Sequence, residues 1–545
     1  MRRLKTLTAL GLVGVLVVGC GSSKKTEPKD QVVKLAWDAD ATTFDSTTEN
    51  NADTMSFVNA QSEGLYRLDE KGKLVNGLAK DIDISDDKMV YTFTLRDTKW
   101  SNGEPLKAQD FVFAFQRLFD QDVPDSVNNR FLAKKGLLGL KNADAIDRGE
   151  MDKSQLGVKA LDDKKLQLTL EDPSPIIGSI LAYPSFFPLN EKFVKNAGSK
   201  YGTSVDLTLG CGPFKLVKWE ANNTIAFEKN PGYYDADKIQ VKGLDFKINT
   251  ESTQRALSYQ SGNVMFTKLT SELVDQYKGT AGFETRMESY LSYLSFNQNN
   301  PALKNVNLRK ALATSFNKAA LVDDILKDGS KVANHIIPEG LAKGPDGKDF
   351  RETAKSGYLK PDKKKAKEYY EKAKQELGKD SFSFVMTVGE RDPGRAIAEY
   401  LKQEIEKNLP GVTINIDTQP SKTFYNKANS KQGYDILSMM WGPDYPYPTT
   451  FTDLWATGGT NNYSNYSSAK YDQLQKDTTV GKLLKDPEKR WEAFKDMEKM
   501  LLEDDAAVAP IYQRGWAGLV NPKLKGISYQ SSGVKWIFRD VHIEE

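Results

Sequence analysis

The sequence predicts an α/β fold, on the evidence of a regular alternation in its C-terminal half and of its length. Short apolar runs alternate there with longer runs of helical periodicity. In chain order they are the strand Phe382–Val388, the helix Arg395–Asn408, the strand Val412–Ile416, the helix Lys422–Ser430 and the strand Tyr434–Met440. A βαβαβ order implies a mostly parallel sheet with right-handed crossovers. At 545 residues the chain has room for two or three domains.

The first residues have the features of an export signal. Three basic residues among the first five precede the apolar run Leu7–Val18, which is too short to span a bilayer. The run ends in Val17-Val18-Gly19-Cys20-Gly21, which resembles a lipobox, the signal-peptidase motif of bacterial lipoproteins. That resemblance implies that residues 1–19 are removed and that Cys20 carries fatty acyl groups such as palmitate at the start of a polar tether, residues 20–30. The alternative is an ordinary signal peptide in which Cys20 is incidental.

The N-terminal half of the remaining chain mixes strand and helix signals, with hairpins where a turn motif separates two apolar runs. The predicted elements are the strand Gln31–Trp37, the helix Asp53–Glu63, the hairpin Leu65–Leu68 with Leu74–Leu78, the strand Val90–Leu95, the helix Ala108–Arg117, the strand Lys165–Leu170, the helix Asn190–Asn196, the hairpin Phe214–Trp219 with Thr224–Lys229, the strand Val241–Asn249, the helix Thr250–Ser261 and the strand Glu288–Phe296.

From Asn305 the period becomes more strongly helical. The elements predicted there, besides the βαβαβ unit, are the helices Asn307–Lys327, Asp362–Leu377 and Pro487–Leu502 and the strands Ala507–Tyr512 and Ile527–Gln530. The two last strands follow a long helix, and we expect them to return to an earlier sheet.

Composition argues against several kinds of partner. The 76 basic residues include three in the export signal, which leaves 73 against 74 acidic residues, a net charge of −1. A near-neutral body argues against nucleic acid as the partner. His335 and His542 are the only histidines and lie far apart in sequence, so no metal site is expected. Cys211 is the only cysteine beside Cys20, so we expect no intrachain disulfide and a small buried thiol at Cys211.

Catalytic motifs are absent from the sequence. No Gly-Lys pair is followed by Ser or Thr, and neither a G-x-S-x-G nor an H-E-x-x-H motif occurs. A Ser/His/Asp triad would need His335 or His542, and no nucleophile is marked near either. The sequence therefore predicts no catalytic residues, no cofactor and no enzymatic activity.

A binding site is indicated instead by the segment Gly433–Phe451. Its predicted strand breaks at Trp441-Gly442-Pro443 and is followed by Asp444 and two further prolines, which stiffen the backbone. A carboxylate just past the end of a buried strand lies where open α/β sheets bind ligands. A turn aspartate that accepts hydrogen bonds from nearby backbone amides is the alternative interpretation of Asp444.

A set of ordered motifs resembles the extracellular solute-binding proteins that serve peptide and nickel ABC importers, over essentially the whole chain after the export signal. The motifs are Glu63-Gly64-Leu65-Tyr66, Gly77-Leu78-Ala79, Tyr91–Arg96, Trp100–Gly103, Ala108–Phe111, Gly210–Phe214, Asn230–Tyr234, Tyr293–Asn297 and Val306–Ala313. The resemblance implies a bilobal periplasmic-binding-protein-like fold with an extra inserted domain and a hinge of two crossings, near Phe296 and Ala509. It places lobe I at residues 31–62, 190–294 and 510–545, the inserted domain at 63–189 and lobe II at 295–509.

The same resemblance implies roles for residues of a cleft between the lobes. In peptide-binding members the aspartate at the position of Asp444 holds the N-terminal ammonium of the ligand. The segment Met440–Gly442, with Trp441 at its centre, would pair with the ligand backbone as an added strand. The other edge would come from Glu49, Asn50 and Asn51. Asn462 and Tyr463 match a polar loop near the cleft in relatives, although a plain Asn/Ser turn explains them equally well.

The resemblance implies a lipid-anchored receptor on the extracellular face of a bacterial membrane, which captures oligopeptides and delivers them to the permease of an ABC importer. The tether, the lysine-rich composition and the lack of disulfides suit a Gram-positive surface. One alternative is a dedicated receptor for a single signalling peptide such as a pheromone. Nickel or haem carriage is disfavoured by the scarcity of histidines and by Asp444. An exported peptidase is the remaining alternative, without a motif to support it.

Overall fold

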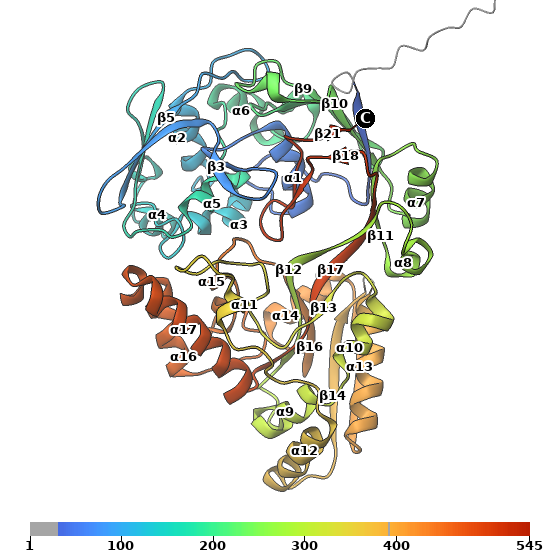
Figure 1. Cartoon of the computed structure of the whole chain (residues 1–545). Helices are drawn as coiled ribbons and strands as arrows, with labels where there is room; N and C mark the ends of the chain where they lie inside the picture. Colours follow the sequence, from blue (N-terminus) through green and yellow to red (C-terminus); the bar gives the residue numbers. More distant parts are fainter. Residues whose placement is uncertain (1–30, 391–392, 545) are drawn as a thin grey trace, which may run out of the picture.

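The protein has two lobes joined by two long strands, as a computed structural model of residues 31–390 and 393–544 shows (Figure 1). The connecting strands are β12 (Phe283–Phe296) and β17 (Val508–Val520), which pair antiparallel along most of their length. At its upper end β17 pairs with β11 (Phe266–Leu269), and at its lower end β12 pairs with β16 in the sheet of the other lobe. One sheet therefore continues through both lobes. The predicted Cys20 and its tether lie outside the residues that the structure describes.

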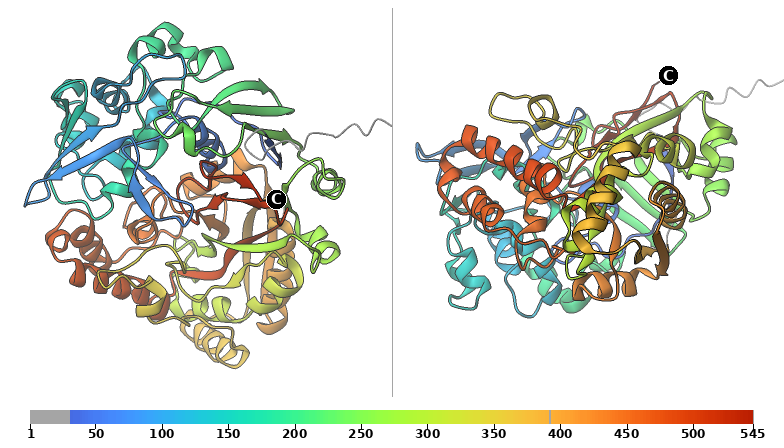
Figure 2. Two further views of the ribbon diagram at one scale, coloured as in Figure 1. Left: turned by 45° about the horizontal axis from the view of Figure 1, so that its top comes forward. Right: turned by 90° about the horizontal axis from the view of Figure 1, so that it is seen from below.

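The upper lobe of Figure 1 contains the first of the described residues, in β1, and the C-terminal segment, which returns to it (Figure 2). Its sheet has the order β1-β10-β9-β8, with β1 parallel to β10 and the other pairs antiparallel. The core is aromatic and includes Trp37, Phe246 and Trp536. Its elements are β1 (Val32–Trp37), α1 (Ala52–Gln61), α6 (Glu191–Ala197), β8 (Phe214–Glu220), β9 (Thr224–Lys229), β10 (Gly243–Ile248), α7 (Ser252–Gln260), α8 (Ser271–Tyr277), β18 (Leu524–Lys525), β19 (Ser528–Tyr529), β20 (Trp536–Ile537) and β21 (His542–Ile543).

A second body lies beside the upper lobe around an antiparallel sheet of order β4-β5-β7-β6. Its hydrophobic core also takes in Cys211 and, from the other lobe, Tyr445. Its elements are the hairpin β2 (Tyr66–Leu68) and β3 (Leu74–Asn76), β4 (Ala79–Ile84), β5 (Val90–Leu95), α2 (Ala108–Arg117), α3 (Val127–Arg130), α4 (Ala143–Asp147), β6 (Val158–Ala160), β7 (Lys165–Thr169) and α5 (Ile177–Leu181). The exact division of the chain at residues 63–189 stays a prediction.

The lower lobe surrounds a mixed sheet of order β11-β17-β12-β16-β14-β15, with β13 paired to β17. Hydrophobic clusters cover both of its faces. Its elements are α9 (Val306–Thr314), α10 (Lys318–Ala320), β13 (Lys331–Val332), α11 (Phe350–Thr353), α12 (Lys363–Leu377), β14 (Phe382–Gly389), α13 (Gly394–Asn408), β15 (Val412–Gln419), α14 (Ser421–Ser430), β16 (Ile436–Trp441), α15 (Thr449–Thr452), α16 (Ala469–Thr479) and α17 (Pro487–Lys499). The predicted βαβαβ unit is confirmed as β14-α13-β15-α14-β16.

The expectation of a mostly parallel sheet was wrong for the sheet as a whole. Only the pairs of β14 with β15 and with β16 are parallel among the described strands of this sheet. β12 and β17 enter from the other lobe and pair antiparallel, so the βαβαβ unit supplies only one side of the sheet. β17 also runs past the predicted end at Tyr512, through Gly515, where a Cβ atom would lie 2.5 Å from the backbone of Gly329. A strand glycine that marks such a close approach weakens the local strand signal.

The predicted helix Asn307–Lys327 was also wrong, because it is interrupted. α9 ends at Thr314, and Asn317 then caps α10 by accepting hydrogen bonds from the amides of Ala319 and Ala320 at 3.1 and 3.4 Å. A wider π-helical turn follows at Leu321–Leu326. An asparagine that competes for backbone amides ends a helix more readily than it continues one.

The two connecting strands carry a buried charge cluster where they pass between the lobes. Glu288 lies in an irregular stretch of β12 between Met287 and Leu291, and it accepts a hydrogen bond from Arg514 of β17. Lys535 lies 3.8 Å from Glu288 and 3.9 Å from Asp53 of α1. Burial alone would raise the pKa of Glu288, but Arg514 and Lys535 lower it below its ordinary value. The cluster thus ties the tail and α1 of the upper lobe to both connecting strands.

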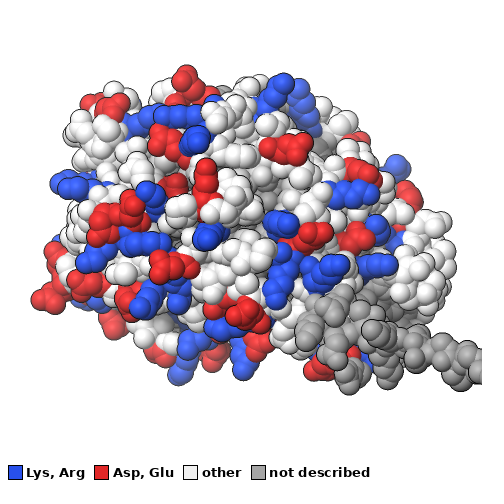
Figure 3. All heavy atoms as spheres, turned by 90° about the horizontal axis from the view of Figure 1, so that it is seen from above, with Lys and Arg blue, Asp and Glu red and all other residues white. Residues whose placement is uncertain are grey.

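Seen from above the upper lobe, basic and acidic side chains are interspersed over the surface (Figure 3). This mixture agrees with the near-neutral composition. Among the helices of residues 31–390 and 393–544, none has both the length and the hydropathy that a bilayer crossing needs.

Candidate functional site

The end of β16 has an edge that is open to a further strand. One side of the strand pairs with β12, where Leu291 lies opposite Trp441 and Ser292 opposite Met440. On the other side, β14 pairs with Ile436 and Leu437 only. Beyond Leu437, no strand of the described residues pairs with this second edge, and both Met440 and Trp441 are half-buried. The backbone there is placed to pair with an extended ligand.

Asp444 follows this open edge, and its carboxylate has no hydrogen-bond donor among the described residues. Its backbone N–H donates to the Thr450 hydroxyl at 3.2 Å, which fixes the turn without using the carboxylate. The backbone hydrogen bonds that the turn interpretation requires are therefore not made. The side chain is open to the space between the lobes, but protein surrounds that space, and this burial raises the pKa of Asp444 to about 6.

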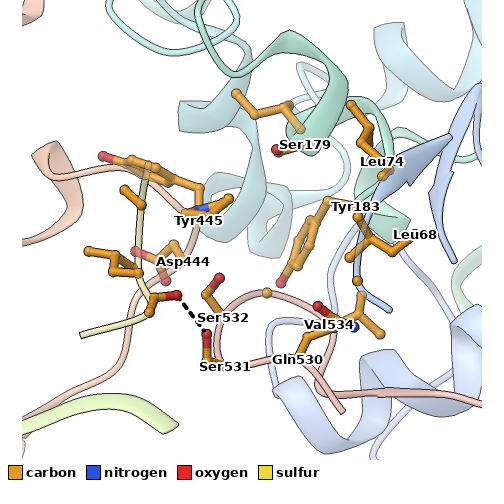
Figure 4. A pocket seen from close by; sticks show the side chains of 18 of the residues that line it. Leu68, Leu74, Ser179, Tyr183, Asp444, Tyr445, Gln530, Ser531, Ser532 and Val534 are labelled. Atoms are coloured by element: carbon orange, nitrogen blue, oxygen red, sulfur yellow. Dashed lines mark hydrogen bonds between the residues drawn. The ribbon is translucent and has the colours of Figure 1, made fainter. Parts of the chain in front are cut away.

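Two adjoining cavities meet at Asp444. One has a volume of about 320 Å³ and is drawn in Figure 4, where Asp444 and Tyr445 lie opposite Leu68, Leu74 and Val534. The other, of about 560 Å³, has Asn50 to Ala52 of the upper lobe and Gly442 to Asp444 of the lower lobe in its walls. Tyr183, Ser532 and Gly533 line both cavities. The space between the lobes is thus large enough for a small ligand, with the free carboxylate at its middle.

The predicted residues divide into two groups by position. Asn50, Asn51, Gly442 and Asp444 together line the cavity of about 560 Å³, with Met440 and Trp441 in the strand that leads to it. Glu49 is buried, and its carboxylate accepts hydrogen bonds from the backbone amides of Asn50 at 2.8 Å and Asn51 at 2.6 Å. Glu49 thus shapes the loop that presents the two asparagines.

Asn462 and Tyr463 lie elsewhere, inside the lower lobe, and line neither cavity. The amide nitrogen of Asn462 donates to the carbonyl oxygens of Ala456 at 3.0 Å and Tyr466 at 2.7 Å. The hydroxyl of Tyr463 donates to Asn461 at 3.1 Å. These contacts hold a turn together, as the alternative interpretation of this loop expects.

Several residues of the cavities were not predicted. Tyr183 comes from the body with the β4-β5-β7-β6 sheet, Tyr290 from β12, and Ser532 and Lys535 from the C-terminal tail. Each belongs to a segment that reaches the cleft only through tertiary packing. The one local signal that could have marked them is the cluster of small residues Ser531 to Gly533, which resembles any surface turn.

Gly442 is required by the aromatic ring of Tyr290. A Cβ atom at Gly442 would lie 2.1 Å from the Cε1 atom of Tyr290. The ring has little freedom to withdraw, because the Arg514 guanidinium lies 4.0 Å and the Lys535 ammonium 5.0 Å from its centroid. The strand end, the tyrosine and the charge cluster between the lobes therefore form one packed unit.

Gly442→Ala is expected to lower the free energy of unfolding by about 1–3 kcal/mol, since the added methyl group overlaps the Tyr290 ring. Urea denaturation measures the change. Gly389→Ala is the matched control at the end of β14, because a Cβ atom there meets nothing within 4 Å. Equal stability of the two variants would contradict the packing described here.

Metal binding and thiol catalysis have little support in the described residues. No group of three or more His, Cys, Asp or Glu side chains that could hold a metal ion occurs in residues 31–390 and 393–544. Cys211 is buried, as predicted, and burial raises the pKa of its thiol to about 12, so the thiolate nucleophile is scarce at neutral pH.

Comparison with known proteins identifies the family. The profile of "Bacterial extracellular solute-binding proteins, family 5 Middle" matches residues 73–463. A dipeptide-binding protein of Lactococcus lactis subsp. cremoris is 32% identical over 553 residues, covering 98% of each chain. The substrate-binding domain of an oligopeptide ABC transporter from Bacillus anthracis superimposes with a TM-score of 0.80 at 37% identity, covering 95% of this chain and 99% of that one. The pheromone receptor PrgZ gives 0.79 at 29%, covering 95% and 100%.

These matches confirm the predicted bilobal α/β fold and the predicted resemblance. The relatives are solute-binding proteins and not enzymes, as the missing catalytic motifs indicated. From its strand order, its cleft and its similarity over nearly the whole length, this chain belongs to the bacterial extracellular solute-binding proteins of family 5.

Proposed function

We propose that this protein is a receptor that binds oligopeptides in the cleft between its lobes and delivers them to an ABC importer. The observation that carries the proposal is the free carboxylate of Asp444 beside the open edge of β16. The matches to a dipeptide-binding protein and to the substrate-binding domain of an oligopeptide transporter support it.

The chemistry of a peptide fits this arrangement. A free peptide carries a terminal ammonium, and transfer of that group from water into a cleft costs several kcal/mol unless a carboxylate pairs with it. The peptide ammonium pairs with the carboxylate of Asp444. The peptide backbone forms hydrogen bonds with the open edge at Met440 and Trp441, as an added strand. Asn50 and Asn51 stand on the opposite wall and offer polar groups to the other side of the peptide. Because these contacts involve the peptide backbone, they do not depend on the side chains of the peptide.

Mass spectrometry of the ligand that co-purifies with the protein from its native host tests the proposal. We expect intact peptides with free N-termini; their absence, with another class of solute in their place, would refute it. A cleavage assay with the same peptides addresses the peptidase alternative, because a binding protein returns every peptide uncut.

A dedicated receptor for one signalling peptide is the second candidate, favoured by the similarity to the pheromone receptor PrgZ. The two candidates predict different sets of co-purified peptides. A broad mixture of peptides supports nutrient uptake, whereas a single peptide at high occupancy supports signalling.

We further propose that Cys20 anchors the protein to the outer face of the membrane through lipid, on a Gram-positive cell. The support is the lipobox-like sequence that ends in Cys20 and the family's extracellular description. Cys20→Ser is expected to move the protein from the membrane fraction to the culture medium, since acyl chains supply the membrane affinity. Immunoblots of the two fractions measure this, with Ser22→Ala as the control. Retention of Cys20→Ser in the membrane fraction would contradict lipid anchoring.

A further inference from the structure

The loop that presents Asn50 and Asn51 to the cleft is neither helix nor strand over residues 45–51. It lies between β1 and α1 of the upper lobe, and its residues Asp45, Thr47 and Glu49 are each at most 5% exposed. A loop that is buried in this way must satisfy its backbone carbonyls and its carboxylates inside the protein. The partners of these groups therefore determine where the loop lies.

Two residues of the second body, around the β4-β5-β7-β6 sheet, supply these partners. The guanidinium of Arg117, at the end of α2, donates to both carboxylate oxygens of Asp45 at 2.6 Å each and to the Thr47 hydroxyl. The side-chain amide of Asn129 in α3 donates to the carbonyl oxygens of Thr47 at 3.0 Å and Glu49 at 2.7 Å. Both residues are buried, and neither lines either cavity of the cleft. A bidentate ion pair and an amide with both protons in use hold the loop in one geometry.

The chain of contacts continues from these partners to the wall of the cleft. Glu49, whose carbonyl accepts from Asn129, orients the backbone amides of Asn50 and Asn51 with its carboxylate. The side chain of Asn51 in turn caps α1. The side chain of Asn50 is exposed in the cavity of about 560 Å³ and has no hydrogen-bond partner among the described residues. The second body thus fixes the backbone next to a side chain that is free to bind a ligand.

We infer that Asn129 and Arg117 are positioning residues for the peptide, so that the second body sets the affinity of the cleft without contacting the ligand. The inference rests on the proposed function, in which Asn50 lies opposite the open edge of β16. With the loop held, the Asn50 side chain is in place before the peptide arrives. Without these contacts, binding would have to order about one residue of the loop, which weakens affinity about tenfold.

Asn129→Ala removes both donors and tests the inference by calorimetry with penta-alanine, which carries the backbone groups of the proposed contacts. We expect binding about tenfold weaker than that of the unmodified protein. Asn408→Ala is the matched control, because Asn408 is also a buried amide that donates to a carbonyl, that of Ser315 at 2.8 Å, and lines neither cavity. If Asn129 only joined the second body to the upper lobe, both variants would lose stability and keep their affinity, which would overturn the inference.

A double-mutant cycle with Asn50→Ala separates positioning from stability. Asn50 has no side-chain partner in the described part of the protein, so its replacement removes only a contact to the ligand. In the Asn50→Ala background, Asn129→Ala is expected to weaken penta-alanine binding less than about threefold, because the loop no longer has that contact to position. An undiminished tenfold effect there would show that Asn129 does not act through Asn50.

Arg117→Lys is a second variant, which decides the question if Asn129→Ala does not fold. Lysine keeps the charge opposite Asp45 but cannot bind both carboxylate oxygens in one fork, so we expect penta-alanine to bind about fivefold more weakly. Arg539→Lys is its control, since Arg539 also forms a buried pair, with Asp235 at 2.6 Å, away from both cavities. Unchanged affinity of Arg117→Lys would overturn the inference. Failure of the unmodified protein to bind penta-alanine would instead refute the proposed function.

Discussion

Asp444→Ala is expected to weaken peptide binding at least tenfold, which is a loss of about 1.4 kcal/mol or more. Without the carboxylate, the peptide ammonium enters the cleft unpaired, because among the described residues Asp444 is the only acidic one that lines the cavity of about 560 Å³. Asp444→Asn keeps the size of the side chain and should lose a similar factor. Calorimetry with one peptide measures both variants, and Asp323→Asn, at an exposed position of the lower lobe, is the control.

The pH dependence of binding follows from the same carboxylate. Burial raises the pKa of Asp444 to about 6 in the free protein, and a bound ammonium would lower it again. Affinity should therefore fall as the pH drops below about 6, because peptide binding must then expel a proton. It should also fall above about 8, where the peptide amine itself becomes neutral. Asp444→Asn removes the acidic limb only, and a flat profile for the unmodified protein would contradict the ammonium role.

The contribution of Asp444 to folding stability depends on pH in the opposite direction from its contribution to peptide affinity. This difference separates a loss of binding from a loss of folding. The pKa of Asp444 is raised above its ordinary value of 3.8, so between that value and about 6 the folded state holds more protons than the unfolded state. Its contribution to stability falls as the pH rises through this window. Asp444→Asn should therefore have a higher melting temperature than the unmodified protein at pH 7 without peptide, as is common when a binding residue is neutralised.

Glu288→Gln is expected to lower the free energy of unfolding by about 3 kcal/mol, since the loss of one partner leaves buried charges uncompensated. Glu288 is 3% exposed, and its carboxylate meets Arg514, Lys535 and the hydroxyl of Tyr529. These partners come from β17 and the C-terminal tail. The variant thus removes charge where both connecting strands pass between the lobes.

Glu284→Gln is the matched control for this variant. Glu284 lies on the same strand and pairs with Arg286, but both side chains of that pair are about one-third exposed. The expected loss is below about 1 kcal/mol, because solvent screens such a pair. Urea denaturation of both variants measures the difference. Equal losses would show that the buried cluster contributes no more than a surface ion pair.

The fold was predictable where local periodicity decides it. The unit β14-α13-β15-α14-β16 follows from alternating apolar runs, and the strand before Asp444 was predicted to within two residues. The antiparallel strands β12 and β17 were recognised only in part, since their pairing partners lie more than 200 residues apart in sequence. The helix is interrupted at Asn317 because the side chain of this residue competes for backbone amides. The spacing of apolar residues, on which the helix prediction was based, gives no sign of this competition.

Local sequence pattern predicted only the Asp444 side of the candidate site, and Asn50 and Asn51 of the opposite wall were predicted through the family resemblance. Asp444 stands out because a buried strand, a proline-rich turn and a carboxylate follow one another in sequence. Tyr183, Tyr290 and Lys535 reach the same space from three other segments, and no local pattern distinguishes them from ordinary aromatic or surface residues. Glu49 was predicted from the family resemblance as part of the other edge of the cleft, but its carboxylate accepts hydrogen bonds from the amides of its own loop.

Isothermal titration of the unmodified protein with one peptide in two forms tests the central claim most directly. The forms are the free amine and the N-acetylated peptide, which differ only in the group proposed to meet Asp444. We predict that acetylation weakens binding at least tenfold at pH 7, because the carboxylate then has no ammonium to pair with. Equal affinity for the two forms would contradict the assignment of the cleft as an N-terminal ammonium site.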